Sequence, residues 1–149
     1  MRTIKFRAKV KTINIGCDKN VGDWVCGDLH LLSKIPHIHT NSRKYIIDTE
    51  TIGQFTGLYD CNEKEIYEGD IVEWTFFYND IVGNGGAIYR DTIVKGVIEW
   101  EQGGFILKVT ENDFENAGQY GISSLVTDTE NDVIVIGNIY DNPELLKGE

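Results

Sequence analysis

The sequence is poor in the features that would set it apart from ordinary globular proteins. It holds three cysteines and two prolines in 149 residues, and no apolar run approaches the roughly 20 residues of a membrane-spanning helix. A small, odd number of cysteines does not form a disulfide framework, so we expect free thiols. The opening segment, MRTIKFRAKV, lacks the apolar core of a signal peptide. These absences predict a cytoplasmic protein without a membrane span.

Motifs that hold phosphates or metals are missing as well. The segment GNGG, residues 83–86, is not followed by the Lys-Ser/Thr pair of a phosphate-binding loop, and it lacks the spacing of a dinucleotide fingerprint. Two cysteines and all three histidines fall between residues 17 and 39, but they match no compact zinc finger. We expect Cys26 to be a buried apolar group and the segment His37–His39 to lie in a loop after Pro36. The sequence therefore predicts no metal and no cofactor.

The densest group of carboxylates surrounds Gly69. Paired carboxylates can act as acid and base or bind Mg²⁺, but a turn at Gly69 breaks the strand register that would bring them together. We interpret Glu68-Gly69-Asp70 as a corner before a strand, where glycine relieves the backbone. The four acids are Glu65, Glu68, Asp70 and Glu73. Since no set of residues has both the types and the spacing of a catalytic site, we expect no enzyme.

Charge is divided unevenly along the chain. Residues 1–48 hold nine Lys/Arg and four Asp/Glu, for a net charge of +5. Residues 49–149 hold five Lys/Arg and twenty Asp/Glu, for a net charge of −15. The larger, acidic part repels phosphate backbones, which argues against a protein that binds nucleic acid over its whole surface. Only the basic segment is suited to a polyanion.

The pattern of apolar residues favours short strands joined by glycine turns. Residues 3–11 alternate apolar and basic side chains, which is typical of a half-buried strand with Ile4 at its start. A strand beginning at Gly69, with Val72 and Trp74 on one face, and a hairpin that turns at Gln102-Gly103-Gly104 follow the same logic. We expect Gly53 and Gly57 to interrupt the preceding segment, TIGQFTGLYD.

These elements predict an all-β fold, best explained as a small closed barrel. We expect a single domain over residues 1–149, with a basic N-terminal strand and arm over 1–48 and an acidic barrel core over 49–149. Two long connections, 79–91 and 111–131, would project as hairpins or loops. Asn142 followed by Pro143 predicts the N-cap and first position of a short C-terminal helical turn.

Two groups of side chains are candidates for binding. The outward face of the first strand carries a row of cations that suits phosphate or an acidic protein, or else blocks unwanted strand pairing: Lys5, Arg7, Lys9 and Lys11. The run WTFFY holds more bulk than a small barrel interior accommodates, so part of it would be exposed as a protein interface. Its candidate residues are Trp74, Phe76, Phe77 and Tyr78.

Three segments together resemble the YopX family of phage and prophage proteins. They are IKFRA at 4–8, TIGQFTGLYDCNEKEIYEGDIVEW at 51–74 and VIVIGNIYDNPELL at 133–146. The resemblance implies a barrel-like all-β protein made in the bacterial cytoplasm, and it implies no enzymatic activity. Its matched positions read as turn and cap residues: Gly57, Gly69, Gly137, Asn138 and Pro143.

Two functional hypotheses follow. The first is a non-enzymatic interaction protein that self-associates, in which the basic strand of one copy meets the acidic part of the next, or that binds a host or phage protein. Such a contact weakens as ionic strength rises. The second is a small β-barrel that binds single-stranded nucleic acid through the basic strand and nearby aromatic residues. The acidic remainder makes the second hypothesis less favoured.

Overall fold

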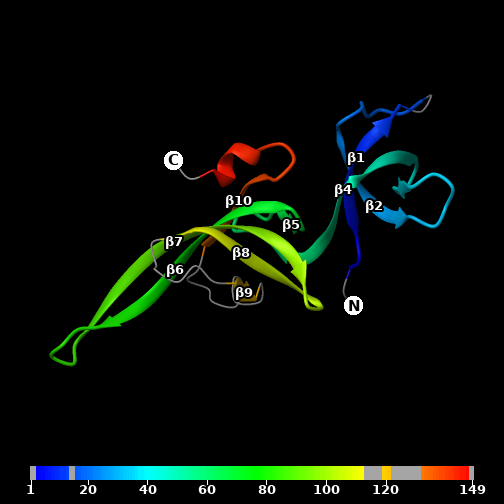
Figure 1. The fold of residues 1–149 in the computed structure, drawn as a ribbon. Coiled ribbons are helices and arrows are strands. Elements are labelled where there is room, and N and C mark those ends of the chain that lie inside the picture. The colour runs from blue at the N-terminus through cyan, green and yellow to red at the C-terminus, as the bar shows by residue number, and fades with distance from the viewer. Residues whose placement is uncertain (1–2, 14–15, 113–118, 122–131, 148–149) are drawn as a thin grey trace. The chain divides into compact units, whose positions relative to one another are not determined.

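The computed structural model describes residues 3–13, 16–112, 119–121 and 132–147 (Figure 1). The predicted all-β class is confirmed, because strands account for nearly all of the regular structure. The strands are β1 Phe6–Thr12, β2 Trp24–His30, β3 His37–His39, β4 Lys44–Tyr59, β5 Glu65–Tyr67, β6 Asp70–Ile81, β7 Ala87–Glu101, β8 Gly104–Asn112, β9 Gln119–Gly121 and β10 Asp132–Asn138. A 3-10 helix, η2, spans Pro143–Leu146. None of the helices in the described ranges has the length and apolar character needed to cross a membrane.

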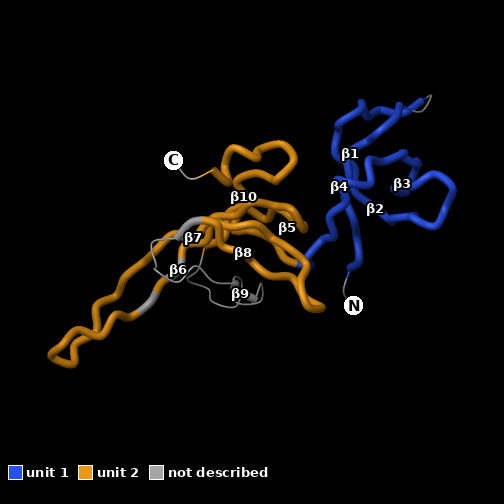
Figure 2. Tube along the Cα trace, viewed as in Figure 1, with its two compact units in different colours: residues 1–57 blue, residues 58–149 orange. Residues whose placement is uncertain are grey.

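The chain divides into two compact units, residues 1–57 and 58–149, coloured separately in Figure 2. By the composition of the sequence, the first unit holds nine Lys/Arg and five Asp/Glu, net +4, and the second five and nineteen, net −14. The expected division into an arm, residues 1–48, and a barrel core, residues 49–149, stays a prediction.

The first unit is built from β1 to β4, which form antiparallel pairs in the order β1-β2-β3-β4. Strand β4 also returns to pair with β1, from Phe6 opposite Gln54 to Thr12 opposite Ile46. This pairing nearly closes the sheet into a ring, although shifts of register keep it from being a regular barrel. The side chains inside it are mostly aliphatic: Ala8, Val10, Val25, Ile38, Tyr45 and Ile47.

Two details of the first unit differ from the sequence-based expectation. Ile4 is 64% exposed, so the buried alternation begins only inside β1. The predicted breaks at Gly53 and Gly57 are wrong: β4 continues through both residues, and Gly53 lies opposite Arg7. A glycine without a side chain is tolerated there because the ladder between β1 and β4 is already irregular at Arg7.

The second unit contains a sheet in the order β10-β6-β7-β8-β9. Its core is a cluster of apolar side chains from one face of this sheet, joined by Ile66 of β5: Val72, Trp74, Val94, Ile98, Phe105, Leu107, Val133 and Val135. The predicted hairpin turn is confirmed between β7 and β8, where Gln102 and Gly103 have φ of 51° and 86°. The expected connection at 79–91 is a hairpin whose strands continue to Ile81 and from Ala87. Most of the other one, 111–131, lies outside the described residues.

Close backbone approach explains one glycine inside β7. Gly96 lies between Val72 of β6 and Val109 of β8. A Cβ added there would stand 2.5 Å from the Lys108 carbonyl oxygen and 2.8 Å from Leu107 Cδ1. Neither backbone nor a buried leucine can move away without disturbing the sheet, so the strand requires glycine here.

We therefore expect Gly96→Ala to destabilise the protein by about 1–3 kcal/mol, the usual cost of forcing extra volume into a packed core. Gly104→Ala is the matched control, because nothing lies within 4 Å of a Cβ built at Gly104. It should change stability by less than about 0.5 kcal/mol. Thermal and urea unfolding followed by circular dichroism measure both. Equal effects of the two substitutions would contradict the close-approach explanation.

Candidate binding surfaces

The acid-rich corner at Gly69 is bonded to the backbone around it. Asp70 is 1% exposed, and its Oδ2 accepts a hydrogen bond from the Tyr67 amide at 2.8 Å. Gly69 has φ of 83°, donates to the Ile98 carbonyl at 2.8 Å and accepts from the Ile139 amide at 2.9 Å. A residue with a side chain rarely adopts such a φ. The corner therefore organises the fold, as the sequence interpretation held.

Asp60 performs a similar task at the edge of the second sheet. Its Oδ1 accepts from the amides of Asn62 and Lys64 at 2.8 and 2.9 Å, and its Oδ2 accepts from the Val135 amide at 3.1 Å. The neighbouring Cys61 amide donates to the Val133 carbonyl at 2.9 Å. The turn thus satisfies the outer edge of β10, and exposed strand edges of this kind otherwise invite pairing with other chains.

The C-terminal turn is stabilised by the side chain of Asn138, which accepts hydrogen bonds from backbone amides. Asn138 Oδ1 accepts from the amides of Tyr140 and Asp141, both at 3.0 Å. Asn142 stands at the predicted N-cap of η2 but makes no side-chain capping bond. Its Oδ1 instead accepts from the Asn138 amide at 3.4 Å and would lie 2.6 Å from a Cβ at Gly137. The predicted helical turn is confirmed with Pro143 at its start, but the side chain of Asn142 does not cap it.

The cations of β1 lie against aromatic rings. The guanidinium of Arg7 is 4.7 Å from the centroid of the Trp24 ring, and Lys9 Nζ is 5.5 Å from the same centroid. Lys5 Nζ lies 5.2 Å from the centroid of Phe55. Arg7 is only 8% exposed as a result. Three of the four cations predicted to face outward, Lys5, Arg7 and Lys9, therefore lie against aromatic rings of their own unit. The fourth, Lys11, is exposed.

The aromatic run WTFFY is divided between the core and the surface. Trp74 is 2% exposed and belongs to the core of the second unit. Phe77 is half-buried and stacks on Tyr89 of β7, with ring centroids 5.7 Å apart. Phe76 and Tyr78 lie in β6, and their side chains are outside the described part of the structure.

A face of apolar side chains runs along the far part of the β6–β7 hairpin. Residues 76–81 and 87–93 pair with each other, beyond the last described pairs of β6 with β10 and of β7 with β8. We call this two-stranded segment the ribbon. Strand alternation places four large apolar side chains on the face opposite to Trp74 and Val94, together with Asn79, Ala87 and Asp91. The four are Phe77, Ile81, Tyr89 and Ile93.

This ribbon face is open to solvent. Ile81 is 80% exposed, Tyr89 57% and Ile93 53%. Sequence reasoning named none of these three residues as candidates: 79–91 was predicted only as a projecting hairpin or loop, and Ile93 falls in the predicted hairpin that turns at Gln102-Gly103-Gly104. The missed signal is that Ala87, Tyr89 and Ile93 are spaced by even numbers of positions, which places them on one face of a strand.

The three histidines gather on the outer face of the first unit. The expectation of a loop at His37–His39 is wrong, because these residues form β3, which pairs with β2. Cys26 is exposed and not buried, since it lies on the outer face of β2. The rings of His30 and His37 stack with centroids 4.8 Å apart and planes 4° apart. Within the described ranges, no three His, Cys, Asp or Glu side chains are arranged as a ready-made metal site.

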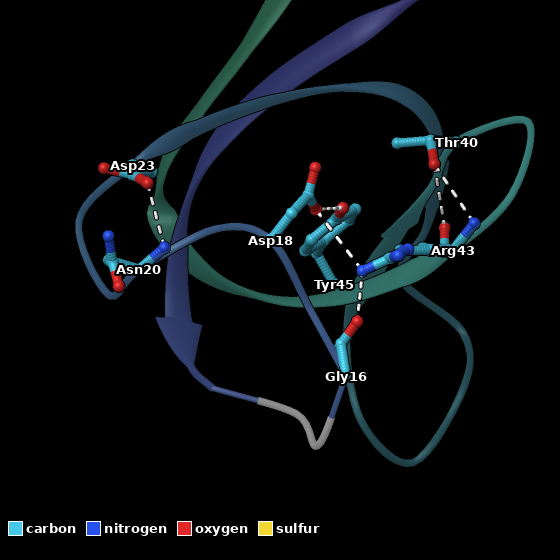
Figure 3. A network of polar contacts seen from close by, with 7 residues as sticks. All are labelled: Gly16, Asp18, Asn20, Asp23, Thr40, Arg43 and Tyr45. Carbon is cyan, nitrogen blue, oxygen red and sulfur yellow. Dashed lines mark hydrogen bonds and ion pairs between the residues drawn. The ribbon is translucent and has the colours of Figure 1, made fainter.

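A polar network fastens the β1–β2 loop to β4 (Figure 3). The Tyr45 hydroxyl donates to Asp18 Oδ1 at 2.6 Å, and the Arg43 guanidinium lies 3.6 Å from the same oxygen and also donates to the Gly16 carbonyl. The hydrogen bond from Tyr45 lowers the pKa of Asp18, with a smaller contribution from Arg43. The same bond raises the pKa of Tyr45. The network holds a loop in place and offers no group for chemistry.

Comparison with known protein families gives one match. The family profile described as YopX protein matches residues 5–147, nearly the whole chain. No curated protein matches the sequence.

The edge-capping role of Asp60 leads to a prediction. Asp60→Ala leaves three backbone amides without their acceptor, so we expect a loss of about 1–3 kcal/mol in unfolding free energy. Cys61→Ala is the matched control, because Cys61 is exposed and uses only its backbone amide in the turn. Chemical denaturation measures both variants. A control as unstable as Asp60→Ala would mean that the carboxylate is not the cause.

The Asp18–Tyr45 bond predicts a pH-dependent contribution to stability. Because the pKa of Asp18 is lowered from 3.8, its contribution is present above about pH 4 and is lost as pH falls through the folded-state pKa. Because the pKa of Tyr45 is raised from 10.0, its contribution is present below that pH and is lost as pH rises further.

The test is the difference in unfolding free energy between the natural protein and Tyr45→Phe, measured across pH. We expect a constant difference between about pH 5 and pH 9 that shrinks at both extremes. A difference that persists unchanged at acidic pH would show that the hydroxyl stabilises the loop without the carboxylate.

Proposed function

Since the chain belongs to the YopX protein family, we propose that it is a non-enzymatic protein-interaction module that associates with a second copy of itself. In this proposal it is encoded by a phage or prophage and acts in the cytoplasm of the bacterial host. The observation that carries the proposal is the ribbon face of Phe77, Ile81, Tyr89 and Ile93.

The physical argument begins with the stability of the ribbon. An isolated two-stranded hairpin is marginally stable in water, because its apolar face is covered on neither side. Residues 76–81 and 87–93 have only each other as described strand partners. Exposed apolar side chains gathered on one face usually mark a contact with another protein. Association that covers Ile81, Tyr89 and Ile93 would stabilise both the ribbon and the complex.

Charge favours a second copy as the occupant. Residues 76–93 contain only Asp80, Arg90 and Asp91 as charged groups; Asp80 pairs with Arg90 at 3.1 Å on the opposite face, and Asp91 lies on the ribbon face beside Phe77. The remainder of the second unit is strongly acidic, so two copies repel each other over most of that surface. The ribbon is where this repulsion is weakest, and charge depletion is typical of interface centres. A two-fold axis would bring one ribbon face against its equivalent.

The charge-driven alternative has less support. It requires the cations of β1 to meet the acidic part of another copy, yet Arg7 is buried against Trp24 and Lys9 shares that ring. The stacking of Arg7 and Lys9 on Trp24 also affects the second hypothesis, binding of single-stranded nucleic acid. It brings cations and an aromatic ring together, as such binding sites do, but the cations already contact the ring on which a base would stack.

Substitution of the ribbon face tests the proposal. Ile81→Lys and Ile93→Lys should each raise the dimer dissociation constant at least tenfold, because burial of one isoleucine contributes about 1.5–3 kcal/mol. Leu32→Lys is the matched control, an apolar residue of the first unit that is fully exposed. Sedimentation velocity over a concentration series measures the constants. A protein that stays monomeric throughout, or variants that associate as well as the control, would refute the proposal.

Ionic strength separates the two modes of association. Contact through the ribbon face should persist or tighten between 50 and about 500 mM salt, since apolar association is not screened. A contact between the basic and acidic units should weaken over the same range. Charge reversal with Lys5→Glu and Lys9→Glu gives the complementary result: it should leave the ribbon dimer intact and abolish a charge-driven contact or nucleic-acid binding.

A further inference from the structure

Four side chains of types that bind metals form one block on the outer face of the β2–β3 ladder. Asp28 lies directly opposite His39, and His30 lies directly opposite His37. Between them, Leu29 packs against the core and Ile38 is fully buried. Since successive residues of a strand point to opposite faces, all four polar side chains lie on the outer face.

The spacing of the block suits a small ligand. Cross-strand neighbours have Cβ atoms about 4.5–5.5 Å apart, and residues two apart in a strand are about 7 Å apart. The ring of His30 lies 4.8 Å from that of His37 and 6.2 Å from that of His39, between centroids. The three imidazoles are therefore neighbours on the surface, but in the described arrangement their nitrogens do not converge on one point, so metal binding requires the exposed rings to turn.

His37 is held with one nitrogen directed away from the backbone. Its Nδ1 lies 3.0 Å from the Ile35 carbonyl oxygen and 3.2 Å from Ser33 Oγ. A carbonyl oxygen only accepts, so Nδ1 carries the hydrogen and the neutral ring presents its lone pair at Nε2. Donation from the second nitrogen to a backbone carbonyl is the outer-shell arrangement that orients metal-binding histidines.

We propose that the β2–β3 face binds a divalent transition-metal ion, Zn²⁺ in the first instance, through the imidazoles of His30, His37 and His39. Nε2 of His37 is the fixed ligand. His30 and His39 are exposed, so their rings turn from the stacked arrangement toward the ion at little cost. The Asp28 carboxylate supplies the nearby negative charge and suits the fourth coordination position of a tetrahedral zinc ion.

The positive charges of neighbouring lysines limit the affinity of the site for zinc. Lys44 lies opposite His39 on β4, and Lys34 lines the same hollow as His37, of about 360 Å³. These ammonium groups repel a cation, so the site binds more weakly than a closed structural zinc site. Binding would join β2 to β3 and stabilise the folded first unit by mass action. The inference does not depend on the proposed self-association.

The test is titration of the full chain with zinc chloride under reducing conditions, followed by calorimetry and by the imidazole proton resonances. We expect one equivalent to bind and to shift the resonances of all three histidines, whereas Mg²⁺ shifts none, because it prefers oxygen ligands. His30→Ala and His39→Ala should each weaken binding at least tenfold. Both residues are exposed, and thermal unfolding without zinc checks that the variants remain folded.

Thiols are the competing ligands, so Cys26→Ser and Cys61→Ser are the controls. Both cysteines are exposed, and Cys26 lies on the same face of β2 as Asp28. Zinc affinity that is unchanged in these variants and reduced in the histidine variants supports the site. Failure of the natural protein to bind zinc, or loss of binding only in a cysteine variant, would overturn it.

Discussion

A fold whose regular structure is nearly all strand must satisfy the backbone groups at every sheet edge. Edge amides and carbonyls left open recruit other strands and lead to aggregation. The first unit meets this constraint by bringing β4 back to β1, which nearly closes the ring. The second unit meets it at β10 with a side chain, because the Asp60 carboxylate takes the Val135 amide. Within the described residues, the ribbon is protected by neither device.

The need to satisfy backbone amides explains the roles of two acidic residues in the carboxylate-rich segment 57–74. Asp60 and Asp70 are buried acceptors for backbone amides, and a buried polar group is tolerated only when it is bonded in this way. The high density of carboxylates there resembles a catalytic cluster in sequence. In the structure Asp60 and Asp70 accept from the amides of different residues, and Glu65 accepts from the Tyr67 hydroxyl.

Local features of the fold could be predicted from the sequence, because alternation and glycine turns are local properties. The hairpin at Gln102 and Gly103 and the corner at Gly69 are examples. Contacts set by the pairing of distant strands could not be predicted. The closure of β1 on β4 joins Phe6 to Gln54, the burial of Arg7 depends on Trp24 of another strand, and the block of three histidines exists only through the β2–β3 register. No spacing rule along the chain reports these contacts.

The tip of the ribbon has an evolutionary consequence. The turn Val82–Gly86 lies at the end of two strands in unbroken register, where Gly83 and Gly85 have no atoms within 4 Å of an added Cβ. Insertion or deletion of two residues in each strand beside this turn would leave the core untouched and preserve which side chains share a face. Each such step changes the reach of the ribbon by about 7 Å. Related proteins can therefore diverge in the length of this arm while they keep the same body.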